Sequence, residues 1–488
     1  MPLIDIGSQK QLLLDDYIVE SLTDTRRALN PAEKVEDNPV LESKLPWEER
    51  DLTLIGIAFD PADDTFKMWY RPRTFSARRG DGQIVVSGEW DSGPGICLAT
   101  SDDGVHWERP SLGLVEYDGS KQNNILPPWG NVERLIWREV MLDHHESDPA
   151  RRFKSLVATR DTTLPRMTLH LFTSPDGITW TGHPGNPVID EATSGVWGPV
   201  YWDPVRETYA ALMENCLHRR CPYGKRVIGR SDSPDMVHWS EPETILVSDD
   251  DDPPDTEFYG MFATAYEGLD VASLWIFKTT DMTHHPQFVF SRDGVRYDRR
   301  YKEPFILRGS GTEFDSVSLY GFAPIVHGDR ILTYYMARNW RSPETLLQLG
   351  DRARGAIGLA VSRLDGFVSL DGAKGVATDA VPLRSKVPEH SQMVTRAFGF
   401  SGSLLHLNVE AALQQWGAGP CEVRVQVLTS QHNPVPGFDL GNADPITTSG
   451  IAQVVSWNGS PDVSSLAGRP IKLRIYFKNA KLYSFQFR

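Results

Sequence analysis

The chain has 488 residues, of which 40% are hydrophobic and 24% are charged, and its formal net charge is −15 at pH 7. A chain of this length is expected to fold as more than one domain. The acidic charge argues against nucleic acid or an anionic membrane surface as the main partner, because both select basic proteins. The sequence has no apolar run long enough to cross a membrane as a helix, and a neutral small molecule or a glycan stays compatible with this composition.

The first forty residues form an N-terminal extension with one apolar strand pattern, QLLLDDYIV at 11–19. Two roles stay open for this strand: it acts as a latch on the last repeat described below, or it packs at a domain interface. The start of the chain has no basic segment followed by an apolar run, which predicts a cytoplasmic protein. Secretion or a periplasmic location is the alternative if a signal precedes this sequence.

Five similar segments follow between residues 54 and 339, each an apolar strand, a polar turn and an aromatic-rich strand. They read LIGIAFDPADDTFKMWY, EVMLDHHESDPARRFKSLVAT, GPVYWDPVRETYAALMEN, MFATAYEGLDVASLWIFKTT and GFAPIVHGDRILTYYMARN. Alternating apolar positions broken by Asp-Pro or Gly-Asp turns predict antiparallel hairpins.

A short motif, Ser-x-Asp-Gly-x-x-aromatic, follows each segment. The copies are SDDGVHW, SPDGITW and SRDGVRY, with looser forms in SDSPDMVHW and SRLDGFV. The first copy lies in TSDDGVHWERP (100–110), where acids and a histidine crowd together as they do in active sites. Repetition favours a turn instead, since Ser and Asp side chains bond backbone N–H groups and Gly adopts positive φ. If the segments form the blades of a β-propeller around a central channel, we expect these turns on one face of the propeller, beside the turns between the first two strands of each segment. The mouth of the channel that holds a site would then lie on the opposite face.

Five such units in succession predict an all-β fold with a five-bladed β-propeller over residues 41–372. After residue 370 the strands alternate without the motif, which predicts a C-terminal β-sandwich over 373–488. One long β-sandwich with chance turns is the alternative.

The four cysteines, Cys97, Cys216, Cys221 and Cys421, are too scattered for a disulfide framework. Cys216 and Cys221 are close enough to pair across a loop, but reduced thiols are the expectation. Metal-binding spacings of the CxxC or HxxxH kind are absent from the sequence. We therefore expect no cofactor and no metal, with a Ca²⁺ ion in the channel as the open alternative.

Candidate catalytic residues come from the propeller geometry, which brings the residues just before each first strand to one mouth of the channel. The acids there are Asp51, Glu139, Glu257, Glu313 and Asp315, while the third blade has Gly195 in that position. Of these, Asp51, Glu139 and Glu257 are the predicted catalytic residues. Glu313 and Asp315, together with Arg138, are predicted to bind the substrate. Clustered carboxylates shift one another's pKa, giving one protonated acid and one ionised base, as glycosidic cleavage requires. The alternative is that each acid pairs with a nearby arginine, such as Arg50 or Arg138.

Candidate substrate-binding residues lie in the loops that flank this mouth. Two loops rich in arginine predict a site for a carboxylate or sulfate on a sugar; their residues are Arg71, Arg73, Arg219 and Arg220. Aromatic side chains near the mouth are candidate platforms for sugar rings: Trp47, Trp137, Trp197, Tyr259 and Trp340. Solvated loops and buried packing are the alternatives for these two sets.

On these residues the chain resembles the five-bladed propeller glycoside hydrolases of families 32, 43, 68 and 117. RDLTLIGIAFDPADDTFKMWY is similar to the family 43 opening, and a propeller followed by a sandwich is similar to the family 32 layout. The chain looks most like a bacterial group loosely labelled family-32-like glycosyl hydrolases. The shared stretches are LLLDDYIVE, NPVLESKLPWE, DPPDTEFYGM, EFDSVSLYGFAPIV and RLDGFVSLDG, with a tail ending LYSFQF.

The resemblance implies three channel acids: Asp51 as base or nucleophile, Glu139 as an acid that tunes pKa, and Glu257 as the general acid. Apolar neighbours and nearby carboxylates are expected to raise the pKa of Glu257. The chain departs from family 43 in the third blade, where Gly195 replaces an acid.

The sequence thus predicts a glycoside hydrolase that removes terminal sugars, furanosides or acidic sugars among them, from oligo- or polysaccharides. One alternative is a glycan-binding propeller without catalysis. Another is a lyase or transglycosylase that uses Tyr259 or an arginine in place of the acid pair. Homo-oligomerisation stays open.

Overall fold

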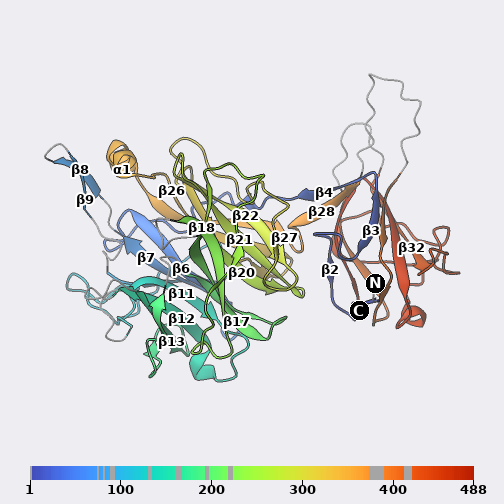
Figure 1. The fold of residues 1–488 in the computed structure, drawn as a ribbon, viewed down its shortest axis with the longest axis horizontal. Coiled ribbons are helices and arrows are strands. Elements are labelled where there is room, and N and C mark those ends of the chain that lie inside the picture. Colours follow the sequence, from blue (N-terminus) through green and yellow to red (C-terminus); the bar gives the residue numbers. More distant parts are fainter. Residues whose placement is uncertain are drawn as a thin grey trace, which may run out of the picture. The chain divides into compact units, whose positions relative to one another are not determined.

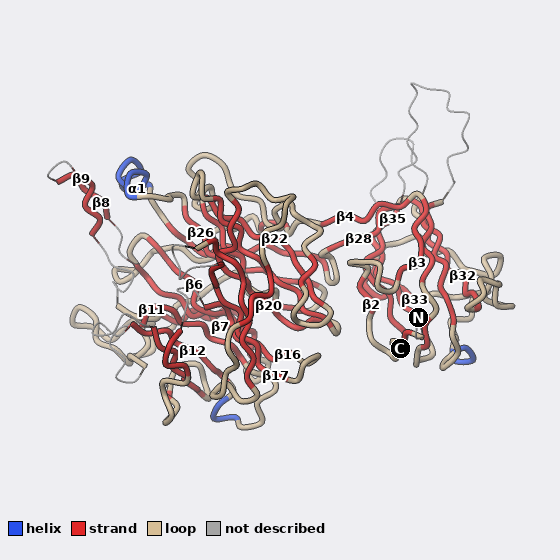
Figure 2. The backbone as a smooth tube through the Cα atoms, viewed as in Figure 1, coloured by secondary structure: helices blue, strands red, loops and turns tan. Residues whose placement is uncertain are grey.

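A computed structural model describes residues 3–73, 76–80, 83–87, 94–129, 135–160, 167–192, 197–217, 224–372, 390–411 and 420–488. Their regular secondary structure is almost entirely β-strand, with loops between the strands and one short α-helix, α1 (Pro343–Leu349) (Figure 2). The prediction of an all-β chain is confirmed. Three short 3₁₀ segments, Pro149–Arg151, Gly350–Arg352 and Ser464–Leu466, complete the helical structure of the described residues.

The chain divides into two compact units (Figure 1). The smaller unit comprises Met1–Asn30, Val326–Ile331 and Ser362–Arg488. The larger unit comprises Pro31–Ile325 and Leu332–Val361. The N-terminal residues therefore fold with the C-terminal strands, and the repeated segments fold together.

The larger unit consists of consecutive antiparallel sheets. The first contains β6 (Asp51–Asp60), β7 (Thr65–Arg73) and β10 (Cys97–Ser101). The second contains β11 (Leu135–Leu142), β12 (Phe153–Arg160), β13 (Met167–Ser174), β14 (Thr181–Gly182) and β15 (Ile189–Ala192). The third contains β16 (Trp197–Asp203), β17 (Thr208–Leu217), β18 (Lys225–Ser233) and β19 (Glu243–Leu246).

The next strands along the chain continue the same pattern, apart from Val326–Ile331, which belong to the smaller unit. The fourth sheet contains β20 (Thr256–Tyr266), β21 (Leu269–Lys278), β22 (Thr283–Ser291) and β23 (Tyr297–Asp298). After it come β24 (Ser318–Gly321), β25 (Ile325–His327), β26 (Arg330–Arg338) and β27 (Gly355–Arg363). A separate hairpin pairs β8 (Ser76–Gly80) with β9 (Gln83–Ser87).

Neighbouring sheets touch through parallel contacts, and the last strands return to the first. Val140 of β11 lies beside Gly56 of β6, and β16 lies beside both β11 and β20. Gly355 of β27 lies beside Asp51 of β6, which closes the succession on itself. Gly56 is needed at its contact, because a Cβ there would lie 2.6 Å from the carbonyl oxygen of Val140.

Strand β5 (Glu33–Lys34) pairs antiparallel with β27. The apolar segment at 11–19, for which a latch role was considered, instead supplies β2 (Gln11–Leu12) and the start of β3 (Val19–Thr23). These two strands pair with strands of the smaller unit, β35 (Ala480–Phe487) and β29 (Ser391–Thr395). The strand that pairs with β27 is therefore β5.

The smaller unit has two six-stranded sheets whose side chains meet in one hydrophobic cluster. One sheet contains β1 (Ile4–Asp5), β3, β29, β30 (Phe398–Gly399), β32 (Glu422–Thr429) and β34 (Ile471–Lys478). The other contains β2, β4 (Thr25–Leu29), β28 (Val368–Gly372), β31 (Leu405–Ala411), β33 (Gly450–Val454) and β35. Both sheets bury alternate residues against this cluster, as strands with one apolar face do.

The repeated motif forms a tight turn, as predicted. In the first copy the Ser101 hydroxyl accepts a 2.9 Å hydrogen bond from the N–H of Gly104. The Asp103 carboxylate accepts 2.8 Å bonds from the N–H groups of Val105 and His106, and the φ of Gly104 is 76°. The copies at Ser174 and Ser291 repeat this pattern. TSDDGVHWERP is therefore a turn built by side chains rather than an active site.

The two looser copies differ from this turn in the residue that adopts the positive φ. In SDSPDMVHW, Met236 adopts the positive φ, 64°, in place of glycine. In SRLDGFV, Asp365 has a φ of 62°, and its buried carboxylate forms a 3.0 Å ion pair with Lys10. That fifth copy lies in the smaller unit and is not the repeated turn.

The carbonyl groups of three motif glycines also accept hydrogen bonds from a neighbouring sheet. The carbonyl of Gly104 accepts from the Tyr334 hydroxyl at 2.6 Å, and that of Gly177 accepts from the Trp69 indole at 2.7 Å. The carbonyl of Gly294 accepts from Arg230 at 2.6 Å. The turns thus link successive sheets of the larger unit.

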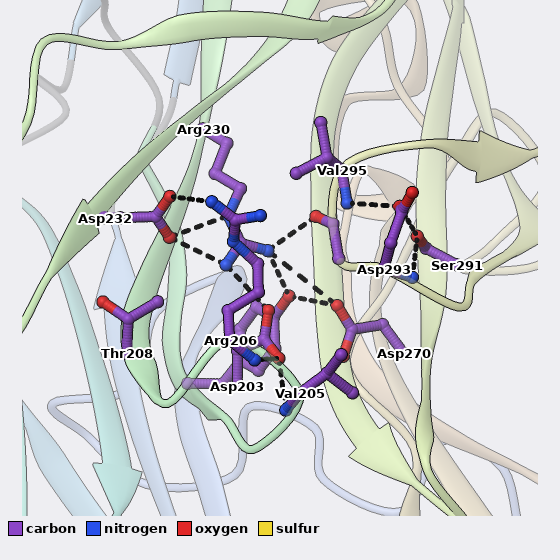
Figure 3. Close-up of polar contacts among 12 residues, drawn as sticks. Asp203, Val205, Arg206, Thr208, Arg230, Asp232, Asp270, Ser291, Asp293 and Val295 are labelled. Atoms are coloured by element: carbon purple, nitrogen blue, oxygen red, sulfur yellow. Dashed lines mark hydrogen bonds and ion pairs between the residues drawn. The ribbon is translucent and has the colours of Figure 1, made fainter.

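Figure 3 shows one such link, in which Arg230 lies between Asp203 and Asp232. Asp203 ends β16, so it lies in the turn between the first two strands of its sheet. A Cβ on Gly294 would lie 2.4 Å from the Asp203 carboxylate. The two kinds of turn therefore share one face, as predicted, which leaves the opposite strand ends for a site.

Candidate functional site

At the opposite strand ends, Asp51 forms a buried ion pair. Asp51 is the first residue of β6 and is 1% exposed. Arg338, the last residue of β26, donates to both of its oxygens, at 2.9 Å from Nε and 2.7 Å from Nη2. A Cβ on Gly355 would lie 1.8 Å from Oδ1 of Asp51, so glycine is required there. The neighbouring Arg50 does not pair with Asp51 but contacts Asp351 at 2.5 Å.

A second cluster joins Glu257 of β20, Glu214 of β17 and Arg226 of β18. Arg226 donates a 2.7 Å hydrogen bond to Oε2 of Glu257, and its Nε lies 3.5 Å from Oε1 of Glu214. Burial raises the pKa of Glu214 to about 7, opposed by the Arg226 charge and increased by the Glu257 charge. One arginine therefore serves two carboxyl groups in different environments.

This arrangement changes the expected division of roles. Glu257 has an ion pair that a protonated carboxyl would lose, whereas Glu214 is the acid with a raised pKa. Sequence reasoning missed Glu214. The available signal was a single glutamate in the apolar strand TYAALMENCL, near its end, in the repeated segment whose preceding residues lack the expected acid.

Aromatic side chains lie next to both ion pairs. The Arg226 guanidinium is 5.7 Å from the ring centre of Tyr259 and 5.6 Å from that of Phe277. Burial raises the pKa of Tyr259, the Glu214 charge adds to this, and the charges of Arg226, Arg338 and Arg73 oppose it. Tyr259 therefore lies within the electrostatic fields of both acid–arginine groups.

His284 of β22 lies in the same aromatic group, with ring centres 4.6 Å from Phe277, 4.6 Å from Tyr320 and 4.9 Å from Tyr259. Burial lowers the pKa of His284 to about 3, and the Arg338 and Arg226 charges contribute to this. The imidazole is therefore neutral at physiological pH.

Glu139 lies on β11, partly exposed, and has no hydrogen-bond or ion-pair partner among the described residues. Burial of its carboxyl raises the pKa of Glu139 well above the usual value. Its neighbour Val140 aligns with Gly56 in the parallel register with β6. Glu139 is thus level with Ile55, roughly 13 Å along the strand direction from Asp51.

Asp315 and Glu313 have other partners. Asp315 is 2% exposed and pairs with Lys34 at 2.5 Å and with the Tyr335 hydroxyl at 3.1 Å. Glu313 is exposed and accepts a 2.9 Å hydrogen bond from the N–H of Ser310. In the described structure no hydrogen bond or ion pair joins either acid to Asp51.

Two of the four arginines that were expected in loops lie in a strand. Arg71 and Arg73 belong to β7, where they align with Thr53 and Asp51 of β6, and they are 8% and 1% exposed. The prediction of loop positions is wrong, because the β6–β7 ladder continues to Asp51. Arg219, Arg220, Gly195 and Cys221 lie outside the described residues, as do the side chains of Trp137, Arg138 and Trp197.

Two of the predicted aromatic platforms, Trp340 and Trp47, have different surroundings. The Arg338 guanidinium lies 5.2 Å from the ring centre of Trp340, so Trp340 adjoins the Asp51 ion pair. Trp47 donates a 2.9 Å hydrogen bond to Asn124 and packs edge-on to Tyr117 at 6.1 Å. Trp47 therefore matches the packing alternative.

The structure also bears on cysteines, metals and membranes. Cys216 is disulfide-bonded, so the expectation of a reduced thiol there is wrong, while Cys97 and Cys421 are free and buried.

Over the described ranges, no cluster of three or more His, Cys, Asp or Glu side chains could hold a metal ion. Within the same ranges, no helix has the length and apolarity to span a membrane.

No protein-family model matches the sequence, and no curated protein matches it. A glycosyl hydrolase from Bacteroides ovatus is similar at 16% identity and a TM-score of 0.45, covering 69% of this chain and 94% of that one. A thermostable family-43 glycoside hydrolase is similar at 12% identity and a TM-score of 0.45, covering 69% and 96%.

A β-1,2-mannobiose phosphorylase from Listeria innocua is similar at 13% identity and a TM-score of 0.43, covering 67% of this chain and 96% of that one. These structures are named for different reactions. The narrower resemblance to the family-32-like group stays a prediction.

Proposed function

We propose that this protein is a glycoside hydrolase whose proton donor is Glu214. The observation that carries the proposal is the pairing of two glutamates on Arg226. The pKa of Glu214 is raised to about 7, while Glu257 keeps an ion pair at 2.7 Å. Two carboxyl groups in unlike environments are what acid–base cleavage of a glycosidic bond uses.

In the proposed reaction, Glu214 gives its proton to the leaving glycosidic oxygen. Asp51, held by two hydrogen bonds from Arg338, activates a water molecule or attacks the sugar carbon. Each Asp51 oxygen keeps acceptor capacity beyond its bond to arginine. Glu257 pairs with Arg226, and its charge contributes to the raised pKa of Glu214.

We further propose that the larger unit is a five-bladed β-propeller and the smaller unit a β-sandwich. The successive sheets, the return of β27 to β6 and the pairing of β5 with β27 support the propeller. The single hydrophobic cluster enclosed by two sheets supports the sandwich.

Replacing Glu214 by Gln tests the catalytic proposal. The variant should lose turnover of natural oligosaccharides, whose poor leaving groups need protonation, and retain turnover of para-nitrophenyl glycosides. Glu243→Gln, an exposed glutamate on β19, is the matched control and should behave as wild type. Wild-type rates on oligosaccharides for the Glu214 variant would exclude it as the proton donor.

A glycan-binding protein without catalysis is the second candidate. It is favoured by the ion pairs of both Asp51 and Glu257 with arginine, since clamped carboxylates also suit a purely structural role. Wild-type protein that binds oligosaccharides by calorimetry and releases no sugar would support this candidate. The lyase alternative needs a basic phenolate, and the raised pKa of Tyr259 argues against it.

A further inference from the structure

We infer that His284 is a substrate-binding residue whose Nε2 hydrogen-bonds a neutral hydroxyl group of the sugar. The inference rests on the proposed function for the nature of the ligand. It concerns recognition, which can be measured separately from cleavage.

The geometry around His284 leaves one ring nitrogen for a ligand. Nδ1 lies 3.1 Å from the Ser318 hydroxyl and 3.1 Å from the Tyr320 hydroxyl. Nε2 is buried and has no hydrogen-bond partner among the described residues. The side chain is 7% exposed in total, and its ring stacks on Phe277 with an angle of 11° between the planes.

A buried polar atom without a partner is uncommon in folded proteins, since burial removes its hydrogen bonds to water. Where such an atom persists, a catalytic or ligand-binding role is one of the standard explanations. Here it belongs to a side chain that packs against Tyr259 and lies in the fields of Arg226 and Arg338. The unsatisfied nitrogen thus belongs to the same site as Glu214 and Asp51.

The charges around His284 select the kind of ligand. Arg226 and Arg338 both oppose protonation of the ring, so the imidazole stays neutral. In a neutral ring Nε2 either donates or accepts, depending on which nitrogen carries the proton. A hydroxyl group can match either form, whereas a carboxylate can only accept. Both arginines are already paired, with Glu257 and Asp51, which further favours a neutral hydroxyl over an anionic group.

The neighbouring His285 provides a matched control on the same strand. Successive strand residues point to opposite sides, and His285 is partly exposed. Its pKa is also lowered, to about 4, so both histidines are neutral at physiological pH. Replacing each by Phe keeps a ring of similar size and removes the nitrogen atoms at one position only.

The experiment compares wild type, His284→Phe and His285→Phe with para-nitrophenyl α-L-arabinofuranoside, sucrose and para-nitrophenyl β-D-glucuronide. Binding is measured by calorimetry, and kcat and KM are measured from pH 5 to 8. His284→Phe should weaken binding and lower kcat/KM by about tenfold, the size of one lost hydrogen bond. Because His284 does not titrate in this range, the loss should be the same at every pH. His285→Phe should match wild type.

His284→Gln keeps a hydrogen-bonding group and should recover part of the loss, which a purely structural role would not explain. His284→Gln also provides the comparison with wild type if the Phe variant fails to fold. Equal binding by His284→Phe and wild type would overturn the inference, as would a loss confined to the glucuronide. If the wild-type protein binds a probe without cleaving it, the proposed catalysis is wrong. The inference about His284 is then tested by comparing the binding affinities of wild type and His284→Phe for that probe. A wild-type protein that binds none of the probes overturns both.

Discussion

Arg226 is the residue on which the chemistry of the candidate site depends. Its guanidinium donates a hydrogen bond to Glu257 and has its Nε 3.5 Å from Glu214, with the ring centres of Tyr259 and Phe277 at 5.7 Å and 5.6 Å. A planar group with several donors suits this shared role, which a lysine could not fill. The difference between the two glutamates arises from burial and from how each is bonded to this one cation.

The shared arginine predicts a shift in the pH profile. With Glu214 as proton donor, kcat should fall as pH rises through about 7, where the acid loses its proton. Glu257→Gln removes the negative charge that raises the pKa of Glu214 and leaves Arg226 to pair with Glu214 alone. Both effects lower the pKa of Glu214, so the alkaline limb should move to lower pH. The rate profile of this variant measures the shift.

Glu243→Gln controls for any general effect of removing a glutamate and should leave the limb in place. A limb that moved to higher pH in Glu257→Gln would contradict the coupling between the two carboxyl groups.

At the scale of elements, the repeated turn both stabilises its own backbone and links neighbouring sheets. Its side chains accept hydrogen bonds from the motif's own backbone, and its glycine carbonyl accepts a hydrogen bond from a neighbouring sheet. Gly104 is needed for two reasons, since its φ is 76° and a Cβ would lie 2.6 Å from the Tyr334 hydroxyl. Local turn formation and packing between sheets are therefore coupled at single residues.

Gly104→Ala should lower the free energy of unfolding by about 2–5 kcal/mol, from backbone strain and from steric overlap together. Gly113 is the matched control, because its φ is 69° and nothing lies within 4 Å of an added Cβ. Gly113→Ala should cost only the strain, about 1–2 kcal/mol. Urea unfolding measures both. Turnover per folded molecule should be unchanged, and a selective loss of turnover in Gly104→Ala would mean that the motif faces the site after all.

At the scale of the larger unit, an early strand pairs with the last one. Strand β5 pairs with β27, and Lys34 of β5 reaches the buried Asp315 at 2.5 Å. The acid considered as catalytic at this position thus takes part in closing the structure. The partner of Asp315 comes from a strand of two residues that no amphipathic pattern marks.

Lys34→Met should lower the free energy of unfolding by about 2–3 kcal/mol, because among the described residues the Asp315 carboxylate would keep the Tyr335 hydroxyl as its one partner. The side chain of Lys34 is 27% exposed, which moderates the cost relative to a fully buried pair. Lys44→Met removes an exposed lysine near Glu42 and should change the free energy by less than about 1 kcal/mol. Chemical denaturation of the two variants gives the comparison, and equal stability would show that this ion pair does not help to close the unit.

The sequence by itself determined the strands and turns of this protein. Alternation in LIGIAFDPADDTFKMWY and its relatives, and the Ser-x-Asp-Gly turns, act over a few residues, so a linear pattern records them. The placement of Asp51 as the first residue of β6 and of Glu257 as the second residue of β20 follows from the same local signals. Alternation could not locate the end of β7, which pairing with β6 extends to Arg73.

Only the tertiary structure decided what these acids contact. Asp51 meets Arg338 across 287 positions of the chain, and Glu257 meets Arg226 across 31. The burial that raises the pKa of Glu214 to about 7 and leaves Nε2 of His284 without a partner depends on how several sheets converge. A charge and its partner belong to different strands in such a site, so their pairing is set by strand register and by the closure of the larger unit, neither of which leaves a mark at the residue itself.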